Sequence, residues 1–184
     1  MSRAYKFRNP EGIYFVSFAT IGWIDVFTRR EYKDILVESI KYCQQKKGLE
    51  LFAWCIMSNH VHMIIAAKAG FQLPDIMRDL KKYTSKQILK AIEENPEESR
   101  KEWMLAIFKN AGNYNSNNEN YQFWQQHNKP IEVYSTKVIL QKLDYLHNNP
   151  VEAGYVEYPE EYLYSSAKDY CGDKAGLLKV ELIY

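Results

Sequence analysis

The stretch Leu51-Phe-Ala-Trp-Cys-Ile-Met-Ser-Asn-His60-Val-His62-Met-Ile-Ile-Ala-Ala67 carries the clearest structural pattern of this 184-residue chain. Residues 51–57 and 61–67 are rich in apolar, aromatic and β-branched side chains, which is typical of buried strands. Ser58-Asn59 between them is short and polar, as a tight connection should be. We therefore predict two antiparallel strands joined as a hairpin.

The residues before this hairpin predict a strand followed by a long helix. Residues 13–19, Ile-Tyr-Phe-Val-Ser-Phe-Ala, have the aromatic and β-branched character of a strand. Apolar side chains then recur at helical spacing from Thr28 to about Gln45, and Gly48 ends the pattern. Thr28, with Glu31 three residues later, has the spacing of an N-terminal capping box.

Two further helices are expected after the hairpin. Apolar residues on one side predict a helix over residues 74–94, which Asn95-Pro96 ends. A shorter helix is predicted over residues 98–109. Residues 111–120 are rich in asparagine and contain a glycine, so we expect a mobile loop there.

The remaining part of the chain completes an α+β fold. Residues 121–124 and 131–134 offer a fourth strand, and a last helix spans 136 to about 148, where Pro150 and Gly154 break its pattern. The order β-α-β-β-α-β-α predicts a ferredoxin-like split βαβ antiparallel sheet with an added C-terminal helix. No linker or repeat divides the sequence, so residues 1–184 are expected to form a single domain.

The composition is that of a globular protein without a strong charge bias. Hydrophobic residues make up 46% and charged residues 26% of the chain, which supports a packed core. The formal net charge of +1 means that any nucleic-acid surface must be local. Three widely spaced cysteines predict reduced thiols rather than disulfides. The polar N-terminal residues do not resemble a signal peptide, and the apolar stretch 13–24 is too short to span a bilayer, so we expect a cytoplasmic protein without membrane contact.

Two histidines lie close together in the predicted hairpin. Residues two apart on a strand point to the same face, so His60 and His62 should present their imidazoles side by side while Val61 faces the other way. Neutral imidazole is a common ligand of divalent transition metals. The spacing alone also fits two outward-facing polar residues, or one solvated and one core histidine.

A tyrosine and an asparagine share one face of the last predicted helix. Tyr145 and Asn149 are four residues apart, so a tyrosine hydroxyl could attack an electrophile while Asn149 supplies an oxygen ligand to a metal. Alternatively, Tyr145 is an amphipathic core residue. Asn148-Asn149-Pro150 would then be helix-termination chemistry, since the residue before a proline is disfavoured in the α region.

Together these stretches resemble the HUH single-tyrosine transposases, most closely the REP-associated tyrosine transposase branch. The resemblance runs from the first strand to about residue 170, and His-x-His with Tyr-x-x-x-Asn-Pro-Val is its most specific element. The matching pieces are Trp54-Cys-Ile-Met-Ser-Asn-His60-Val-His62-Met-Ile, Ile76-Met-Arg-Asp-Leu-Lys81-Lys-Tyr-Thr-Ser-Lys86, Tyr121-Gln-Phe-Trp124-Gln, Asp144-Tyr145-Leu-His-Asn-Asn149-Pro150-Val-Glu-Ala-Gly154 and Tyr164-Ser-Ser166.

The resemblance implies a sheet with helices on one face, the histidines on a central strand and the tyrosine helix nearby. It implies that Tyr145 nicks and rejoins single-stranded DNA through a covalent phosphotyrosine, with His60, His62 and Asn149 holding a divalent metal, Mg²⁺ or Mn²⁺. Two imidazoles favour Mn²⁺. The implied partner is single-stranded or hairpin DNA, and the family includes monomers and helix-exchanging homodimers, so the chain is expected to be one or the other.

Other side chains are candidates for the same chemistry. Tyr83 is a rival nucleophile, but Gln87, four residues after it, lies in a lysine-rich face that is more simply interpreted as solvated or DNA-contacting than as part of a metal site. A basic stripe on the second long helix and a basic N-terminal arm could contact DNA phosphates, or could be a solvated helix face and a frayed terminus. The candidate DNA-binding residues are Lys81, Lys82, Lys86, Arg3, Lys6 and Arg8.

Two other functions fit parts of the sequence. A ferredoxin-like nucleic-acid binder that no longer cuts would keep the fold without the reaction. A metal-dependent hydrolase of small molecules would need more carboxylates, and no carboxylate-rich cluster accompanies the histidines. The set of His60, His62, Tyr145 and Asn149 favours the transposase.

Overall fold

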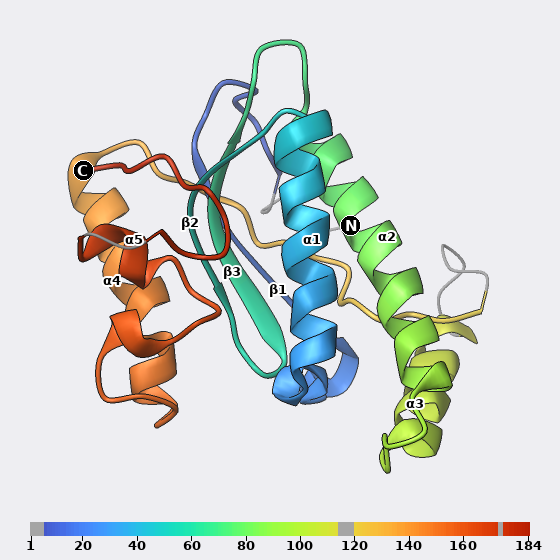
Figure 1. The fold of residues 1–184 in the computed structure, drawn as a ribbon. Coiled ribbons are helices and arrows are strands. Elements are labelled where there is room, and N and C mark those ends of the chain that lie inside the picture. Colours follow the sequence, from blue (N-terminus) through green and yellow to red (C-terminus); the bar gives the residue numbers. More distant parts are fainter. Residues whose placement is uncertain (1–5, 114–119, 173–174) are drawn as a thin grey trace.

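A computed structural model of the chain describes residues 6–113, 120–172 and 175–184 (Figure 1). Four strands form one sheet in the order β2-β3-β1-β4, and each hydrogen-bonded pair is antiparallel. The strands are β1 (Tyr14–Ala19), β2 (Leu49–Ile56), β3 (His60–Ala67) and β4 (Ile131–Glu132). Since β3 separates β1 from β2, the sheet has the split βαβ topology that the sequence predicts.

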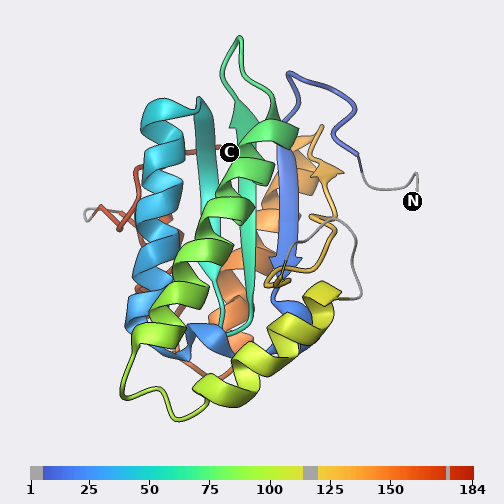
Figure 2. The ribbon, with the colours of Figure 1, turned by 90° about the vertical axis from the view of Figure 1, so that its right-hand side faces the viewer.

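Helices cover both faces of the sheet (Figures 1 and 2). One face carries α1 (Arg30–Lys46) and α2 (Leu73–Glu94), and α3 (Lys101–Asn113) follows at the end of α2. The other face carries α4 (Thr136–Glu152), with the short α5 (Ala167–Tyr170) beside it. Short 3₁₀ turns are η1 (Ile21–Trp23), η2 (Val26–Thr28) and η3 (Pro159–Glu161). No helix within the described ranges combines the length and apolar character needed to cross a membrane.

Strand alternation decides which side chains meet each helical layer. Phe18 of β1 faces α2, where the Lys81 ammonium lies 5.6 Å from the centre of its ring. Phe15 faces α4, where the centre of its ring lies 6.0 Å from that of Tyr145. Because both faces are covered, the middle of β3 is buried throughout, as in strands packed on two sides. The histidine face of the sheet is therefore the face that α4 covers.

The C-terminal segment covers the outer edge of β2 (Figure 1). The Ile56 amide donates to the Tyr164 carbonyl at 2.9 Å, and the Ser166 amide donates to the Trp54 carbonyl at 2.9 Å. An open edge strand exposes unpaired backbone groups that invite association with other chains. The segment around residues 164–166 therefore closes this side of the sheet and ties it to the end of α4.

The predicted capping box at Thr28 is wrong. The α1 helix begins at Arg30, and its N-cap residue is Arg29. Thr28 belongs to η2, where its hydroxyl donates to the Asp25 carbonyl at 3.3 Å. The side chain of Glu31 instead accepts a hydrogen bond from the side-chain Nδ2 of Asn95, at the end of α2. The start of α1 is thus set by tertiary contacts rather than by the local motif.

The last helix continues past the point at which its sequence pattern breaks. Pro150 lies inside α4, although the sequence predicts an end near Asn148. Because Pro150 occupies the last turn, its missing N–H removes only one helical hydrogen bond. The Ala153 amide bonds to the Asn149 carbonyl at 3.0 Å, and Gly154, with φ of 72°, ends the helix in the left-handed conformation.

Two weaker predictions are also corrected. The short helix α3 runs to Asn113, into the predicted loop, and residues 114–119 of that loop lie outside the described residues. Of the two segments offered for the fourth strand, the later one contributes the two residues of β4. In the earlier one, Trp124 makes an isolated bridge to Thr20. Strand propensity alone did not predict which of the two segments pairs with β1, because propensity does not specify a pairing partner.

Candidate active site

His60 and His62 stand side by side on β3, as strand alternation predicts. The centres of their rings are 4.7 Å apart, and the rings are nearly perpendicular to each other. Each ring also touches an aromatic side chain from another element. Trp23 lies 5.8 Å from His60, and Phe15 is stacked 5.4 Å from His62. The imidazoles form the middle of a row of rings on the α4 face of the sheet.

His62 has the properties of an imidazole prepared for a metal ion. It is 3% exposed, and within the described part of the chain neither of its ring nitrogens has a hydrogen-bond partner. Burial above all, with smaller contributions from the neighbouring His60 and Lys142, lowers the pKa of His62 to about 3. The ring is therefore neutral at physiological pH, with a lone pair available for a ligand.

Asn59 fixes the orientation of His60. Its Oδ1 lies 2.7 Å from the His60 Nδ1, and its Nδ2 donates to the Trp23 carbonyl at 3.1 Å. Because Oδ1 can only accept, this arrangement puts the proton of neutral His60 on Nδ1 and leaves Nε2 free as a ligand. Burial lowers the pKa of His60, while its contact with the Asn149 side chain and the charge of Asp25 raise it.

Tyr145 of α4 lies on the same side of the sheet as the histidines. The centre of its ring is 5.2 Å from that of His62, and the residue is 46% exposed. One helical turn later, the Asn149 Nδ2 donates to the Tyr145 carbonyl at 3.1 Å, which leaves the Asn149 Oδ1 toward His60. The structure thus brings together all four residues that the sequence assigned to one site.

Lys142 is a member of this site that the sequence reasoning missed. Its Nζ lies 5.0 Å from the centre of the Phe15 ring and 5.8 Å from that of Tyr145. Across residues 6–113, 120–172 and 175–184 its ammonium has no anionic or hydrogen-bonding partner. The available signal was helical spacing, because Lys142 is three residues before Tyr145 and shares its face.

His147 holds α4 against the C-terminal segment. Its Nε2 lies 2.9 Å from the Ser166 Oγ, and its ring lies 5.1 Å from that of Tyr170. Burial lowers the pKa of His147 to about 4. The side chain points away from Tyr145, so it positions the helix and does not face the reacting groups.

The predicted DNA-binding lysines of α2, Lys81, Lys82 and Lys86, lie on the other face of the sheet. Lys81 donates to the Gln125 carbonyl at 2.7 Å and to the Asn128 Oδ1 at 2.9 Å, which holds the chain after Trp124 on α2. Burial lowers the pKa of Lys81 to about 8. Lys82, Lys86, Lys6 and Arg8 are exposed, whereas Arg3 lies outside the described residues. The structure does not gather these side chains around the histidines.

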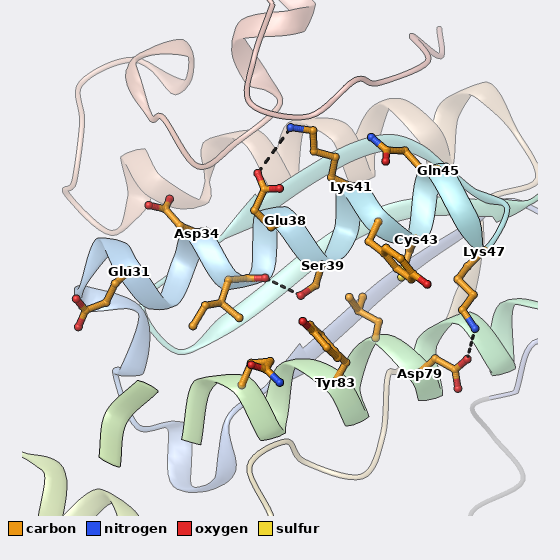
Figure 3. Close-up of a pocket in the computed structure, with 14 residues that line it drawn as sticks. Glu31, Asp34, Glu38, Ser39, Lys41, Cys43, Gln45, Lys47, Asp79 and Tyr83 are labelled. Carbon is orange, nitrogen blue, oxygen red and sulfur yellow. Dashed lines mark hydrogen bonds and ion pairs between the residues drawn. The ribbon is translucent and has the colours of Figure 1, made fainter. Parts of the chain in front are cut away.

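A surface groove between α1 and α2 contains the rival nucleophile Tyr83 (Figure 3). This groove is on the α1–α2 side of the sheet, away from the histidine face. Four carboxylates and two lysines contribute the charge of its lining: Glu31, Asp34, Glu38, Asp79, Lys41 and Lys47. The excess of carboxylates disfavours a DNA phosphate, and the described residues around Tyr83 include no cluster that could hold a metal ion.

The donor set of the histidine site is two imidazoles and an amide oxygen. Among the described residues there is no group of three or more histidines, cysteines and carboxylates that could hold a metal ion. The His60 ring nevertheless lies 4.7 Å from that of His62, whose nitrogens have no partner among the described residues, and His60 also contacts the Asn149 side chain. Nitrogen and oxygen donors of this kind suit a divalent ion such as Mn²⁺ and leave positions open for a substrate.

Comparison with known proteins identifies the family. Residues 16–111, more than half of the chain, match the IS200-like transposase family model, and this range includes both histidines. A solved REP-associated tyrosine transposase bound to a REP hairpin has a TM-score of 0.66 and 16% identity, covering 98% of this chain and 92% of that chain. A protein assigned as a transposase, from Deinococcus radiodurans R1, has a TM-score of 0.45 and 20% identity, covering 80% and 95%. None of the curated proteins matches. The chain shares the fold of the first structure and belongs to the IS200-like transposase family.

Proposed function

We propose that this transposase nicks and rejoins single-stranded DNA through a covalent bond to Tyr145. The observation that carries the proposal is the contact between the Tyr145 ring and His62, at 5.2 Å between ring centres. His62 is a buried imidazole whose nitrogens have no partner among the described residues. A tyrosine hydroxyl on a partly exposed residue, beside imidazole and amide-oxygen donors, is the arrangement that metal-assisted phosphoryl transfer requires.

The reaction exchanges one phosphodiester for another. The Tyr145 hydroxyl oxygen attacks the scissile phosphorus, a phosphorus–oxygen bond forms to the phenol, and the bond to the leaving sugar oxygen breaks. The phenol loses its proton and the departing oxygen gains one, which gives a free hydroxyl on the other strand piece. When the hydroxyl of another strand end attacks the phosphotyrosine, the phenol is restored and the DNA is rejoined without ATP.

The residues present fit a divalent metal, Mg²⁺ or Mn²⁺. His60 and His62 would supply neutral imidazole nitrogens, and Asn149 would supply an oxygen from the helix that carries Tyr145. When bound, the ion would polarise a phosphoryl oxygen and withdraw charge from the scissile phosphate. Asn59 would keep the His60 ring in the tautomer and orientation that leave Nε2 available.

Lys142 would add a second positive charge at the scissile phosphate. Its ammonium rests on the Phe15 and Tyr145 rings rather than on a carboxylate. A cation held at such a position would stabilise the negative charge that develops during attack. This charge stands on the side of the histidine pair that carries the nucleophile.

The proposed substrate is single-stranded DNA next to a hairpin. The solved transposase with the same fold is bound to a REP hairpin, and a hairpin would give this chain a recognisable duplex beside an unpaired cutting site. Lys82, Lys86, Lys6 and Arg8 remain proposed phosphate contacts remote from the cut, whereas the ammonium of Lys81 is engaged by Gln125 and Asn128. The chain would act as a monomer or as a homodimer.

A covalent-adduct assay tests the proposal. Labelled hairpin DNA with single-stranded flanks is incubated with the protein and Mn²⁺ or Mg²⁺, and adducts are separated on a denaturing gel. We expect an adduct with wild type, none with Tyr145→Phe, and an undiminished one with the matched control Tyr83→Phe. An adduct that survives in Tyr145→Phe and disappears in Tyr83→Phe would overturn the assignment.

The alternative of a non-cleaving binder predicts a different outcome. Such a protein would bind the hairpin and leave it intact with either metal, and Tyr145→Phe would change nothing. The unpartnered nitrogens of the buried His62 favour the cutting enzyme, because a ring kept only for packing or binding would be expected to satisfy at least one of them.

A further inference from the structure

Trp23 is displayed beside the site on a backbone that tryptophan rarely adopts. Its φ is 54°, and the preceding Gly22 has φ of 63°. The left-handed region suits glycine, but a bulky side chain there crowds its own backbone. Even so, the indole is 51% exposed, so it does not adopt this conformation in order to become buried. Strain that burial does not explain is a sign of function.

The surrounding residues hold the turn in place. The Trp23 amide donates to the Thr20 carbonyl at 3.2 Å, and the buried Thr20 hydroxyl donates to the Ile24 carbonyl at 2.9 Å. The Trp23 carbonyl accepts from the Asn59 Nδ2 at 3.1 Å. Because Asn59 also contacts His60, one side chain fixes both the displayed indole and a proposed metal ligand.

The position of the indole defines what it can contact. Its ring is 5.8 Å from that of His60, nearly perpendicular to it, whereas Tyr145 contacts His62 at the other end of the pair. The order of ring contacts is therefore Trp23, His60, His62 and Tyr145. A DNA strand whose phosphate lies at the histidines, with Tyr145 on one side, would bring the neighbouring nucleotide over Trp23.

We propose that Trp23 is a stacking platform for an unpaired nucleobase next to the phosphate that Tyr145 attacks. The inference rests on the proposed function and adds a base-binding subsite to it. An exposed aromatic face accepts any base, because every base has a π-face, so the subsite would orient the single strand without reading its sequence. A base inside a duplex has both faces covered by its neighbours, so the subsite favours an unpaired base.

Equilibrium binding in a Tyr145→Phe background measures the subsite without covalent capture. The probe is the hairpin DNA of the adduct assay, and a series of probes carries a single abasic position at each nucleotide of its single-stranded flanks. We expect Trp23→Gly and Trp23→Ala to weaken binding about 5- to 150-fold and Trp23→Phe to weaken it less. Trp103→Ala, which removes an indole that is 46% exposed on α3, should bind like the parent.

Two comparisons protect this experiment from a folding artefact. Glycine accepts the positive φ at position 23, so Trp23→Gly should melt at or above the parent temperature while binding less tightly. At one abasic position, the losses from the missing base and from Trp23→Gly should not multiply, because both remove the same contact. Multiplicative losses at every position, or unchanged binding by Trp23→Gly, would overturn the platform.

The outcomes separate this inference from the proposed function. If Tyr145-intact protein forms the adduct and Trp23 variants bind like the parent, only the platform is wrong. If that protein binds DNA and forms no adduct under any metal condition, the cutting function fails, and the abasic series still decides whether Trp23 stacks on a base.

Discussion

The role of Lys142 can be tested by comparing it with another lysine on the same helix. Its ammonium lies over the rings of Phe15 and Tyr145 and contributes to the lowered pKa of His62. Lys137, one turn and a half earlier on α4, is exposed and serves as a matched control. The two lysines share the same helix and charge, so a difference between their variants reports the position of the charge.

Substitution of Lys142 is expected to slow adduct formation. Removing a preorganised charge or donor at a developing oxyanion costs roughly 100- to 1,000-fold in rate, and a partly exposed ammonium should cost less, about 10- to 100-fold. We expect this loss in Lys142→Gln, partial recovery in Lys142→Arg and no loss in Lys137→Gln, measured as single-turnover adduct rates. Equal rates in Lys142→Gln and wild type would remove Lys142 from the site.

At the scale of elements, a buried carboxylate joins α1 to the segment that leads into α3. Glu98 has a fully buried side chain between Arg29 and Arg100, with N–O distances of 2.8 Å and 2.9 Å. The Tyr32 hydroxyl also lies 3.3 Å from Glu98 Oε2. These contacts, above all that with Arg100, lower the pKa of Glu98 to about 2 against the opposing effect of its burial.

Loss of the Glu98 carboxylate should destabilise the fold without touching the histidine site. Removing one partner of a buried ion pair leaves the other charge uncompensated, which costs about 3–5 kcal/mol, and the partial exposure of both arginines puts Glu98→Ala at or below the lower end. Denaturant unfolding measures this loss, with the exposed Glu97→Ala as control. Since the pKa of Glu98 is depressed, its stabilisation is present above about pH 4.5 and is lost as the pH falls toward 2. A difference of under 1 kcal/mol between the two variants would contradict this account.

At the scale of the whole molecule, buried histidines make the stability of the metal-free protein depend on pH. The pKa values of His62 and His147 are lowered to about 3 and about 4, from an ordinary value of 6.5. Between the lowered pKa values of the folded protein and the ordinary value of 6.5, the unfolded chain binds protons that the folded chain does not. Stability is therefore highest above pH 6.5 and falls with acidification. Each histidine should lower the free energy of unfolding by about 2 kcal/mol between pH 7 and pH 5.

Denaturant unfolding at pH 7 and pH 5, in the presence of a chelator, measures this effect. His147→Gln can keep a hydrogen bond to Ser166 and removes one titrating group, so its stability should change about 2 kcal/mol less than that of wild type over the same range. Substitution of the exposed His127 by glutamine is the control for removing a histidine that is not buried. An identical slope in wild type and His147→Gln would show that His147 does not titrate as its burial implies.

The position of Tyr145 within its own chain also predicts whether two inactive variants can restore adduct formation when they are mixed. Tyr145 lies beside His62 of its own chain, so a complete site needs no second subunit. A mixture of His62→Ala and Tyr145→Phe proteins should therefore form no adduct, even after joint refolding. Restored adduct formation in the mixture would show that the tyrosine helix is exchanged between chains.

The sequence predicts most of the sheet because its strands obey a strong period of two. His60 and His62 share a face for that reason, and the hairpin around Ser58 follows from two apolar runs with a short polar break. Pro150 was misjudged because the rule against proline is weakest where only one helical bond is lost. The cap at Thr28 failed because contacts across the fold, which a local motif does not contain, set the start of α1.

The site was only partly predictable for a similar reason. The proposed ligands His60 and His62 are two residues apart, and the proposed nucleophile Tyr145 is four residues before Asn149, so each pair was visible as a short spacing. The lysines of α2 could not be assigned to a face of the sheet from helical periodicity alone, since periodicity identifies only the apolar side of a helix. Gly22 indicates a turn, yet nothing in the composition shows that Trp23 takes a positive φ and displays its ring there. The role of Asn59 depends on two contacts formed only after folding.

The two parts of the proposed site, the histidine strand and the tyrosine helix, are translated at different times. His62 lies on an early hairpin, whereas Tyr145 sits on a helix that is fastened by the pairing of His147 with Ser166. The roughly eighty residues between His62 and Tyr145 take on the order of ten seconds to translate. A nascent or prematurely ended chain would therefore carry the two histidines without Tyr145 or Asn149, and the proposed cutting activity would arise only once α4 has been made.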